Sequence, residues 1–526
     1  MNKHNFHLFL RTMTALGCLF AGSCMHRDEN QYKDLPAILI NNKGQVTSVV
    51  MNKNIPGPAG IRPESDSPLK LSVMSAILTA IENNVSFRIE RMKPAIMRQD
   101  EAIEKSVFDP VLSAAISSFN GEDVQHMDAE LISLSAGIGQ KLPFGTEIFL
   151  EAGRKSASYE QGDLTDLSEN TWEIGIDQAL MRGRGREVNL VRLRQAEMDT
   201  AISRYELKAA AEFLVAQVEA AYWDCILAKR SISIYEDSLA VANREVEEVK
   251  EKIRVGMLPE TELASAEAEM AERQEKLIDA KGTFAKSSLM LIRLLNLSET
   301  GAGWDTELDL YEDPELPPVS LNRIDSYVET ALKERSDLNQ ARLLVKKMEL
   351  ETVHTRNGLL PKLDFFINLG GSGYAESFTD NTDQDGRDQA YTLGIQFQFE
   401  LRNRGAAARN KKARFSLETA KAAMLNMEQL VQVDVRSAFI DVERAAERVK
   451  ATNAARILWE KTLQNEQEKF RVGKSTLYLV SQAARDMVAS QIAEVESIIE
   501  YRKALMNLYR IQGAILSLKG ISVSNK

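Results

Sequence analysis

Two kinds of hydrophobic pattern divide the chain into short strands and long helices. From Tyr391 to Leu401, apolar side chains occupy every second position and polar or small side chains lie between them. This period of two predicts a strand with one apolar and one polar face, long enough to cross a bilayer at a tilt with lipid on one side and water on the other. A strand of a soluble β-sandwich alternates in the same way, so the pattern alone leaves both interpretations open.

The same alternation recurs elsewhere in the chain. The further expected strands are 363–369, 112–119, 172–176, 132–138 and 146–152. The segments 132–138 and 146–152 form an expected hairpin, joined through Pro143 and Gly145. The sequence leaves open whether this hairpin extends the same sheet or stands apart from it. Without it, each half of the chain provides two strands.

Much longer segments carry apolar residues at helical spacing. The stretches 187–253 and 406–471 contain no proline, and a helix of that length would be about 100 Å long. Toward the end of the first stretch the apolar residues step by three and four. The seam continues after Gly256 and is interrupted only by Arg273. This spacing predicts two antiparallel coiled-coil hairpins.

The two expected hairpins turn at matching sequences. Arg254-Val255-Gly256 ends the first long helix, and Arg471-Val472-Gly473 ends the second. Glycine there suits the left-handed backbone that terminates a helix, and Thr261 and either Ser475 or Thr476 are expected to cap the helices that follow. Any helical hairpin ends in a similar way, but one triplet at both tips favours a contact site.

A tandem duplication sets the domain organisation. Asp109-Pro110 matches Leu360-Pro361, and the tip triplets match each other, while the first copy has additional residues between its strands. Such a duplication usually makes two quasi-equivalent halves of one assembly. We expect repeat 1 at 70–297, an inter-repeat linker at 298–324, repeat 2 at 325–515 and a C-terminal tail at 516–526.

The N-terminus is typical of an exported bacterial protein. Lys3 and Arg11 precede an apolar stretch that leads into Ala21-Gly22-Ser23-Cys24. Because these four residues resemble a lipobox, we expect a signal peptide at 1–23 and acylation of Cys24 as the first mature residue. An ordinary secretory signal with an incidental cysteine is the alternative, and the compartment is then the same. Residues 24–69 are expected to form a polar tether.

Composition narrows the classes of function. The net charge of −11 and the lack of a clustered basic face argue against nucleic acid as a partner. The 5 histidines do not occur at metal-ligand spacing, and no catalytic or cofactor-binding fingerprint is present, so we expect no enzyme, no cofactor and no metal site.

The expected mode of membrane entry follows from the same patterns. Beyond the signal no apolar run reaches the roughly 18 residues of a spanning helix, so a chain that enters a membrane would do so as a closed barrel. Two strands from each half leave unpaired edges, so several copies would have to close it.

The combined pattern resembles the TolC-type outer-membrane factor family over about residues 70–515. Besides the tips, the resemblance is carried by two strand-to-helix junctions and by short sequences that follow the tips. These are Gln178-Ala179-Leu180-Met181-Arg182-Gly183-Arg184-Gly185, Phe399-Glu400-Leu401-Arg402-Asn403-Arg404-Gly405, Leu263-Ala264-Ser265-Ala266 and Val480-Ser481-Gln482-Ala483.

The resemblance implies a mainly α fold with β, in which duplicated coiled-coil hairpins and short strands build a trimeric outer-membrane β-barrel and a periplasmic α-barrel tunnel. Each protomer of that family gives four strands to a twelve-stranded barrel. The implied partners are two further copies of the chain, outer-membrane lipid, a periplasmic adaptor (membrane fusion) protein, and an inner-membrane RND, ABC or similar transporter. The function implied is the outer-membrane channel of a tripartite efflux pump or type I secretion system.

The resemblance also assigns residues at the tips. Arg254, Val255 and Gly256 in repeat 1, with Arg471, Val472 and Gly473 in repeat 2, correspond to adaptor-docking positions. Relatives often carry aspartates in a constricting ring after the second triplet, where this chain has Leu479 and Gln482, so Glu262 is the candidate for a tip constriction. A periplasmic coiled-coil structural lipoprotein without a pore is the alternative function. The sequence specifies neither the cargo nor the pump class.

Overall fold

The computed structural model describes residues 38–40, 68–122, 128–159, 167–297, 303–304, 306–314, 321–375 and 388–523. The chain divides into two compact units, residues 46–519 and, separately, residues 1–45 with 520–526. In the smaller unit, β1 (Ile38–Ile40) pairs antiparallel with β10 (Ile521–Val523). The expected signal peptide and the proposed acylation site Cys24 lie outside the described residues.

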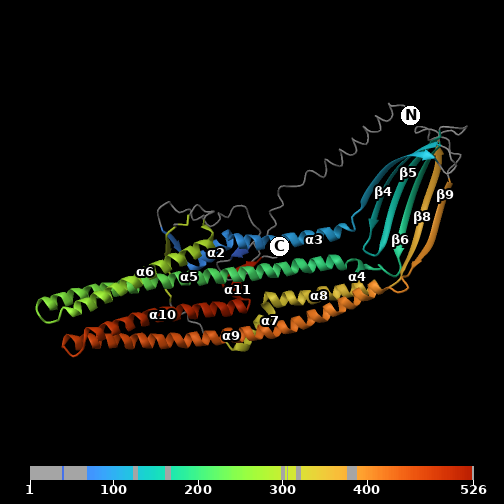
Figure 1. Cartoon of the computed structure of the whole chain (residues 1–526). Coiled ribbons are helices and arrows are strands. Elements are labelled where there is room, and N and C mark those ends of the chain that lie inside the picture. The colour runs from blue at the N-terminus through green and yellow to red at the C-terminus, as the bar shows by residue number, and fades with distance from the viewer. Residues whose placement is uncertain are drawn as a thin grey trace. The chain divides into compact units, whose positions relative to one another are not determined.

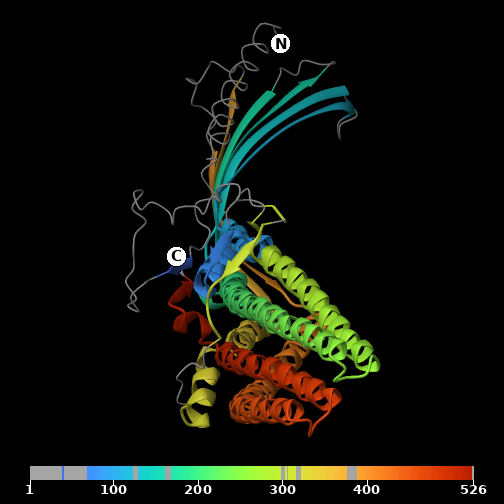
Figure 2. The same ribbon diagram turned by 90° about the vertical axis from the view of Figure 1, so that its left-hand side faces the viewer.

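The larger unit contains one curved sheet that brings both repeats together (Figures 1 and 2). Its described residues form six strands in the order β3-β4-β5-β6-β8-β9, and each strand is antiparallel to its neighbours. These strands are β3 (Val111–Glu122), β4 (Asp128–Lys141), β5 (Thr146–Tyr159), β6 (Leu167–Ala179), β8 (Lys362–Ala375) and β9 (Asp388–Gln398). The hairpin β4-β5 therefore lies inside the sheet, between β3 and β6, and extends it.

Long helices lead directly into and out of the sheet (Figure 1). Those adjoining strands are α3 (Val85–Ser106), α4 (Arg186–Asn189) with α5 (Val191–Arg254), α8 (Ser336–Asn357) and α9 (Arg404–Arg471). Two antiparallel hairpins result when α5 is followed by α6 (Thr261–Leu295) and α9 by α10 (Leu477–Ile511). The fold class predicted from the sequence is confirmed. Among the described residues, no helix has both the length and the apolar character that crossing a membrane requires.

Short elements cover the helices midway along their length. They are α2 (Val73–Asn83), α7 (Ile324–Glu334), α11 (Ile515–Leu518), and the strands β2 (Leu69–Leu71) and β7 (Leu308–Leu310), which pair in parallel. Tyr222 and Trp223 on α5 are fully buried, and the Tyr222 hydroxyl donates to the carbonyl of Leu71 at 3.0 Å. In repeat 2, Tyr327 and Phe439 belong to a second apolar core. These cores fix the middle of each repeat.

Two local predictions are wrong in detail. The sequence predicts an unbroken helix from residue 187, but the chain leaves helical geometry at Leu190, between α4 and α5. The side chain of Asn189 there donates to the carbonyls of Gly183 at 2.7 Å and Gly185 at 3.0 Å, which folds the chain back on the junction. Thr261 does not cap α6, because it is already the first helical residue and no side chain caps that end.

The second predicted cap is present. Thr476 occupies the N-cap position of α10, where its hydroxyl accepts a hydrogen bond from the backbone N–H of Leu479 at 3.4 Å. The neighbouring Ser475 instead donates to Glu466 on α9 at 2.7 Å. Thr476 is therefore the capping residue of the two that the sequence left open.

Candidate functional site

The two helical tips have the same backbone geometry. Gly256 and Gly473 adopt φ of 77° and 75°, in the left-handed region that favours glycine. The residue after each glycine closes the turn: Met257 donates to the carbonyl of Lys252 at 2.7 Å, and Lys474 donates to the carbonyl of Lys469 at 2.8 Å. The duplication is thus preserved in the hydrogen bonds as well as in the sequence.

The tip side chains are also arranged alike. Arg254 pairs with Glu251 and Arg471 pairs with Glu468, each at 2.7 Å and each one helical turn back. Val255 and Val472 are left 61% and 63% exposed, so both tips present an uncovered apolar side chain beside a neutralised charge. Apolar side chains exposed at repeated positions suit contact with another protein.

The first turn of α6 contains the constriction candidate Glu262, which is partly exposed. The equivalent stretch of α10 has no acidic residue in its first turn. Leu479 is 45% exposed there. The first helical turn after the tip therefore carries an acidic side chain in the first repeat and none in the second.

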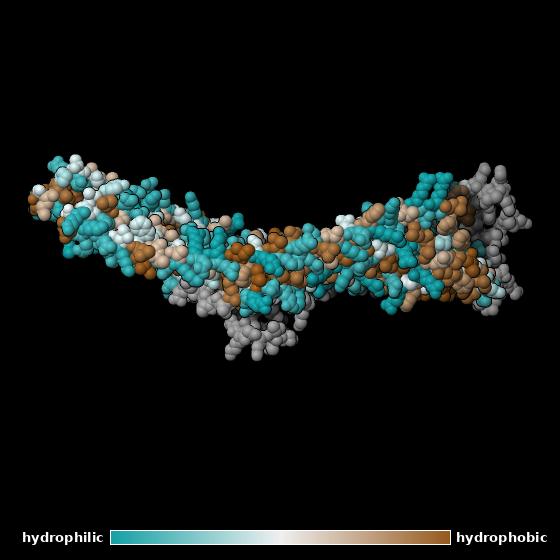
Figure 3. All heavy atoms as spheres, turned by 90° about the horizontal axis from the view of Figure 1, so that it is seen from below, coloured by the Kyte–Doolittle hydropathy of each residue, from teal (hydrophilic) through white to brown (hydrophobic). Residues whose placement is uncertain are grey.

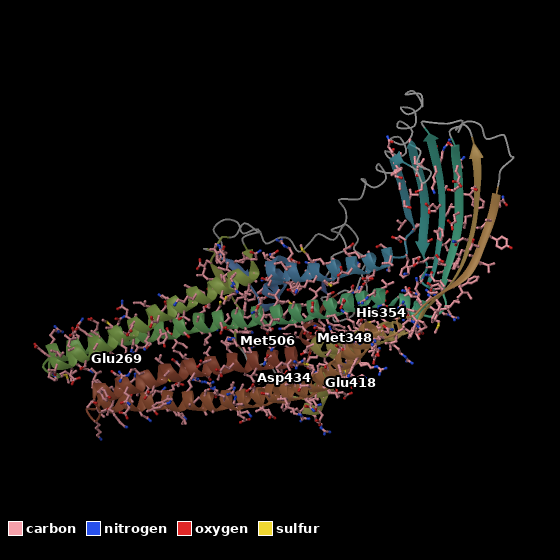
Figure 4. All side chains as sticks on the ribbon, turned by 45° about the vertical axis from the view of Figure 1, so that its right-hand side comes forward. Glu269, Met348, His354, Glu418, Asp434 and Met506 are labelled. Carbon is pink, nitrogen blue, oxygen red and sulfur yellow. The ribbon has the colours of Figure 1, made fainter. Side chains whose placement is uncertain are left out.

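A buried charge cluster joins the two hairpins behind the tips. Figure 4 labels Glu269 on α6, toward the end of the first hairpin. Its carboxylate accepts from Arg273 at 3.2 Å and from Arg485 on α10, and the side chain is only 8% exposed. Arg273 also donates to the carbonyl of Ser238 on α5 at 3.1 Å. The cluster therefore connects three helices from both repeats.

Glu245 on α5 adds a second carboxylate to this charge cluster. Burial raises the pKa of Glu245, whereas Arg273 opposes that rise and Glu269 adds to it. Sequence reasoning noted Arg273 as the one break in the apolar seam but did not assign it a role. The charged Arg273 at a seam position was thus the available signal. Arg485, the other arginine that donates to Glu269, lies too far along the chain to be inferred.

An apolar cluster closes the gap between the hairpins beside these charges. Val246 and Val249 of α5, Ala266 of α6 and Leu477 of α10 are buried together. The ammonium of Lys252 lies 4.8 Å from the centre of the Phe470 ring. The ends of the two hairpins therefore pack against each other within one chain.

The sheet has two chemically different faces. A row of apolar side chains, paired in register, crosses all six strands on one face: Leu112, Ile138, Leu150, Ile174, Leu369 and Tyr391. Each of these side chains is exposed by at least 42%, and Figure 3 shows hydrophobic residues gathered where the strands lie. An exposed apolar area of this extent requires a partner or a lipid environment.

The opposite face is polar and hollow. A depression of about 560 Å³ is lined mostly by residues of this face, among them Ser135, Glu151, Lys155, Glu173 and Asn368. The concave side of the sheet is therefore the polar side.

Two phenylalanines on the polar face lie against the sheet. A Cβ atom on Gly175 would come within 2.1 Å of the Phe149 ring, and one on Gly394 within 2.6 Å of the Phe366 ring. Each ring therefore lies over a glycine of the neighbouring strand, which keeps it close to the wall and leaves the hollow open.

In the part of the chain that the structure describes, no group of three or more His, Cys, Asp and Glu residues is placed to hold a metal ion.

Long paired hairpins that continue a sheet with an apolar exposed face and a polar hollow define a TolC-like outer-membrane channel. The Outer membrane efflux protein family matches residues 147–297 and 327–514. The chain belongs to this family, and the resemblance found in the sequence is confirmed.

Solved structures show the same fold at low sequence identity. The outer-membrane channel OprN is 14% identical, with a TM-score of 0.65 over 84% of this chain and 90% of its own. The CmeC outer membrane channel of Campylobacter jejuni is 14% identical, with a TM-score of 0.61 over 84% of this chain and 86% of its own. The outer membrane protein VceC of Vibrio cholerae is 13% identical, with a TM-score of 0.62 over 84% and 96%. No curated protein matches the chain.

Proposed function

We propose that three copies of this chain form an outer-membrane channel that receives substrate in the periplasm and releases it outside the cell. The two-faced sheet, continuous with the long helices, carries this proposal. Its apolar face, with Ile174 and Leu369 at its centre, would contact acyl chains, and its polar hollow would line a water-filled passage.

Closure by several copies follows from the sheet edges. β3 and β9 each have a neighbour on one side only among the described residues. Unpaired backbone groups are costly in lipid, so the two edges would pair between copies. Successive strands alternate in direction, hence β3 and β9 run antiparallel and such pairing continues the same pattern.

The tips would receive the periplasmic adaptor. Val255 and Val472, with Gly256 and Gly473 beside them, are the proposed contacts, and family membership supports this role. An inner-membrane RND, ABC or similar transporter would supply the substrate. The channel would serve a tripartite efflux pump or a type I secretion system.

Anchoring and gating complete the proposal. Acylation of Cys24 would attach the mature N-terminus to the outer membrane. Glu262 would contribute negative charge at the tip aperture, and the contact of Glu269 with Arg485 would hold the hairpins of one chain together in a narrow state. Binding of the adaptor would then widen the aperture by shifting the coiled coils.

Purification of the mature protein separates this function from a periplasmic structural lipoprotein without a pore. A channel requires detergent for extraction beyond that needed for a lipid anchor, so the test uses the Cys24→Ala variant behind a cleavable secretory signal. We expect a heat-labile trimer that conducts ions in planar bilayers. A soluble monomer with no conductance would overturn the channel in favour of the structural alternative.

A further inference from the structure

We propose that the β4-β5 hairpin is part of the membrane wall, so that three copies close an eighteen-stranded barrel instead of the twelve-stranded one that the family resemblance implies. The inference rests on the proposed trimeric channel. Six strands from each of three copies give this number. Barrel diameter grows roughly in proportion to strand number, so the passage would be about 1.5 times as wide.

The hairpin is paired along its whole length. β4 pairs with β3 from Val111–Gly139 to Glu122–Asp128, and β5 pairs with β6 from Thr146–Gln178 to Ala157–Leu167. β3 and β6 are not neighbours in the sheet. The hairpin thus occupies the place where these two strands would otherwise pair.

The turn of the hairpin is fastened at the helical end of the sheet. The backbone N–H of Gly185 donates to the carbonyl of Phe144 at 2.9 Å, and Asn189 donates to the carbonyl of Pro143 at 3.2 Å. The guanidinium of Arg186 lies 5.4 Å from the centre of the Phe144 ring. Gly145 approaches the carbonyl of Gly183 so closely that a Cβ atom would lie 2.2 Å from that oxygen. A turn held in this way does not leave the sheet easily.

The chemistry of both faces continues through the hairpin. Ile138 and Leu150 lie between Leu112 and Ile174 in the apolar row. On the concave face Glu151 pairs with Glu173 in register. A hairpin folded into the passage would place its apolar side chains in water, which the hydrophobic effect opposes. The family match begins at residue 147, so β3 and β4 lie outside it.

Next to the sheet edges, the helices provide complementary surfaces for neighbouring copies. The helix α3 precedes edge strand β3. One side of α3 exposes apolar residues at coiled-coil spacing: Val85, Ile89, Met92, Ile96 and Ile103. α9, which follows edge strand β9, forms with α8 a groove of about 640 Å³ that includes Met348 and Phe415 (Figure 4 labels Met348). We assign α3 of the next copy to this groove.

Charge and position support that occupant. Lys411 and Lys412 line the groove, and α3 carries acidic residues toward its end, including Glu101 and Glu104. Helix α3 and the groove between α8 and α9 each extend about 30 Å from the sheet along the helices. When β9 of one copy pairs with β3 of the next, α3 of that next copy would therefore also contact the groove between α8 and α9.

The perimeter of an eighteen-stranded barrel agrees with that of the helical tunnel. With a strand spacing of about 4.8 Å and a tilt of about 40°, eighteen strands need a perimeter of about 110 Å and twelve strands about 75 Å. Four helices per copy adjoin the sheet, namely α3, α4 with α5, α8 and α9. Twelve helices packed side by side at about 8–10 Å occupy about 100–120 Å, so the wider barrel continues the helical tunnel without a step.

Cysteine substitutions in the full-length trimer, reconstituted in lipid vesicles, test the position of the hairpin. Ile138→Cys and Leu150→Cys should react poorly with a water-soluble maleimide and, once labelled in detergent, be quenched by spin-labelled lipid. Ser135→Cys and Glu151→Cys should react at least ten times faster with the maleimide. The matched pair on β6, Ile174→Cys and Glu173→Cys, calibrates both readouts. Burial raises the pKa of the native Cys225 thiol to about 11, so it stays unreacted.

Two kinds of disulfide, one within a chain and one between chains, separate the outcomes. Ala114→Cys with Ala136→Cys lie opposite each other on β3 and β4 and should link within one chain. Ile395→Cys combined with Leu112→Cys, Ala114→Cys or Ile116→Cys in turn should link neighbouring chains. Links between chains with maleimide reaction on both faces of the hairpin would overturn the eighteen-stranded wall and leave the channel standing. No trimer and no links between chains would overturn both proposals.

Discussion

Glu269 of the first repeat accepts a charge-assisted hydrogen bond from Arg485 of the second, although the two residues lie on different hairpins. Both oxygens of the carboxylate are engaged, because Arg273 occupies the other one. The contact is therefore a direct chemical link between the repeats behind the tips, within one chain.

Removal of the Glu269 charge should destabilise the helical hairpins. Arg273 is only 7% exposed, so Glu269→Gln leaves a buried guanidinium without the carboxylate that it is hydrogen-bonded to, and breaking a buried pair costs about 3 kcal/mol or more. Urea unfolding followed by helical circular dichroism measures this loss. Glu267→Gln, an exposed neighbour on α6, should leave the midpoint unchanged, and equal midpoints for the two variants would contradict the prediction.

The link of Glu269 with Arg485 should also restrain the aperture. Arg485→Gln keeps the internal pair of Glu269 with Arg273 but frees α10 from α6, so single-channel conductance in planar bilayers should rise. The control is Arg456→Gln, which removes a 2.6 Å pair with Glu494 inside the second hairpin. Conductance that rises equally in both variants would assign the effect to general loosening of the helices.

A negative charge at either tip should impair adaptor docking. Val472→Asp replaces a 63% exposed apolar side chain, and we expect export to fall at least tenfold while the trimer stays intact. Gly473→Pro should have the same result, because proline cannot adopt the φ of 75° found there. Gln464→Asp, two turns before the tip, adds the same charge as a control. Loss of the trimer along with export would contradict the docking assignment.

The stability of the protein should increase on mild acidification because of Glu212. Burial raises the pKa of Glu212 on α5 to about 7 and outweighs the opposing effect of Lys208, whose ammonium lies 3.9 Å away. The folded state therefore favours the protonated carboxyl, a contribution that is complete below the unfolded pKa near 4.5 and is lost as pH rises through about 7. A shift of this size corresponds to up to about 3 kcal/mol.

Unfolding midpoints at pH 5.5 and pH 8 measure this dependence. Glu212→Gln should flatten it and should stabilise the protein at pH 8. The dependence would persist in the variant if other carboxyl groups were responsible, and that result would refute the assignment to Glu212.

The junction side chain Asn189 should hold the β4-β5 turn in place. Asn189→Ala removes hydrogen bonds to the carbonyls of Pro143, Gly183 and Gly185, which together contribute on the order of 2 kcal/mol. Hydrogen exchange at backbone amides of β4 and β5 should accelerate, while exchange in α9 stays constant. Glu187→Ala, exposed on the same short helix, is the control, and equal exchange in both variants would contradict this role.

Much of the fold could be predicted from hydrophobic spacing. The period of two located strands such as β9, and the absence of proline located α5 and α9 to within a few residues of their ends. These features arise from local physics, since side chains two apart share a strand face and those three or four apart share a helix face. The tip glycines at 256 and 473 were predictable for the same reason, because a helix end needs a left-handed residue.

What the sequence did not reveal depends on contacts between distant segments. The place of β4 and β5 between β3 and β6 is set by pairing across the sheet, and the hairpin's own alternation fits either interpretation. Glu269 and Arg485 belong to separate repeats, so neither pattern of spacing nor the resemblance could pair them. The end of α4 likewise depends on carbonyl groups several residues earlier, which attract the amide of Asn189.

β4 and β5 are inserted in the first repeat only. The two halves of the chain therefore differ at the sheet and are alike at the helical tips. In the proposed trimer, six nearly interchangeable tips would face the periplasm with pseudo-sixfold symmetry, whereas the wall in the membrane would be strictly threefold. An adaptor could therefore be recruited in up to six equivalent orientations, while anything that binds the outer rim, such as a phage or an antibody, would find three sites. The mismatch between these symmetries falls on the strand-to-helix junctions, where Asn189 of the first repeat fastens a turn that has no counterpart in the second.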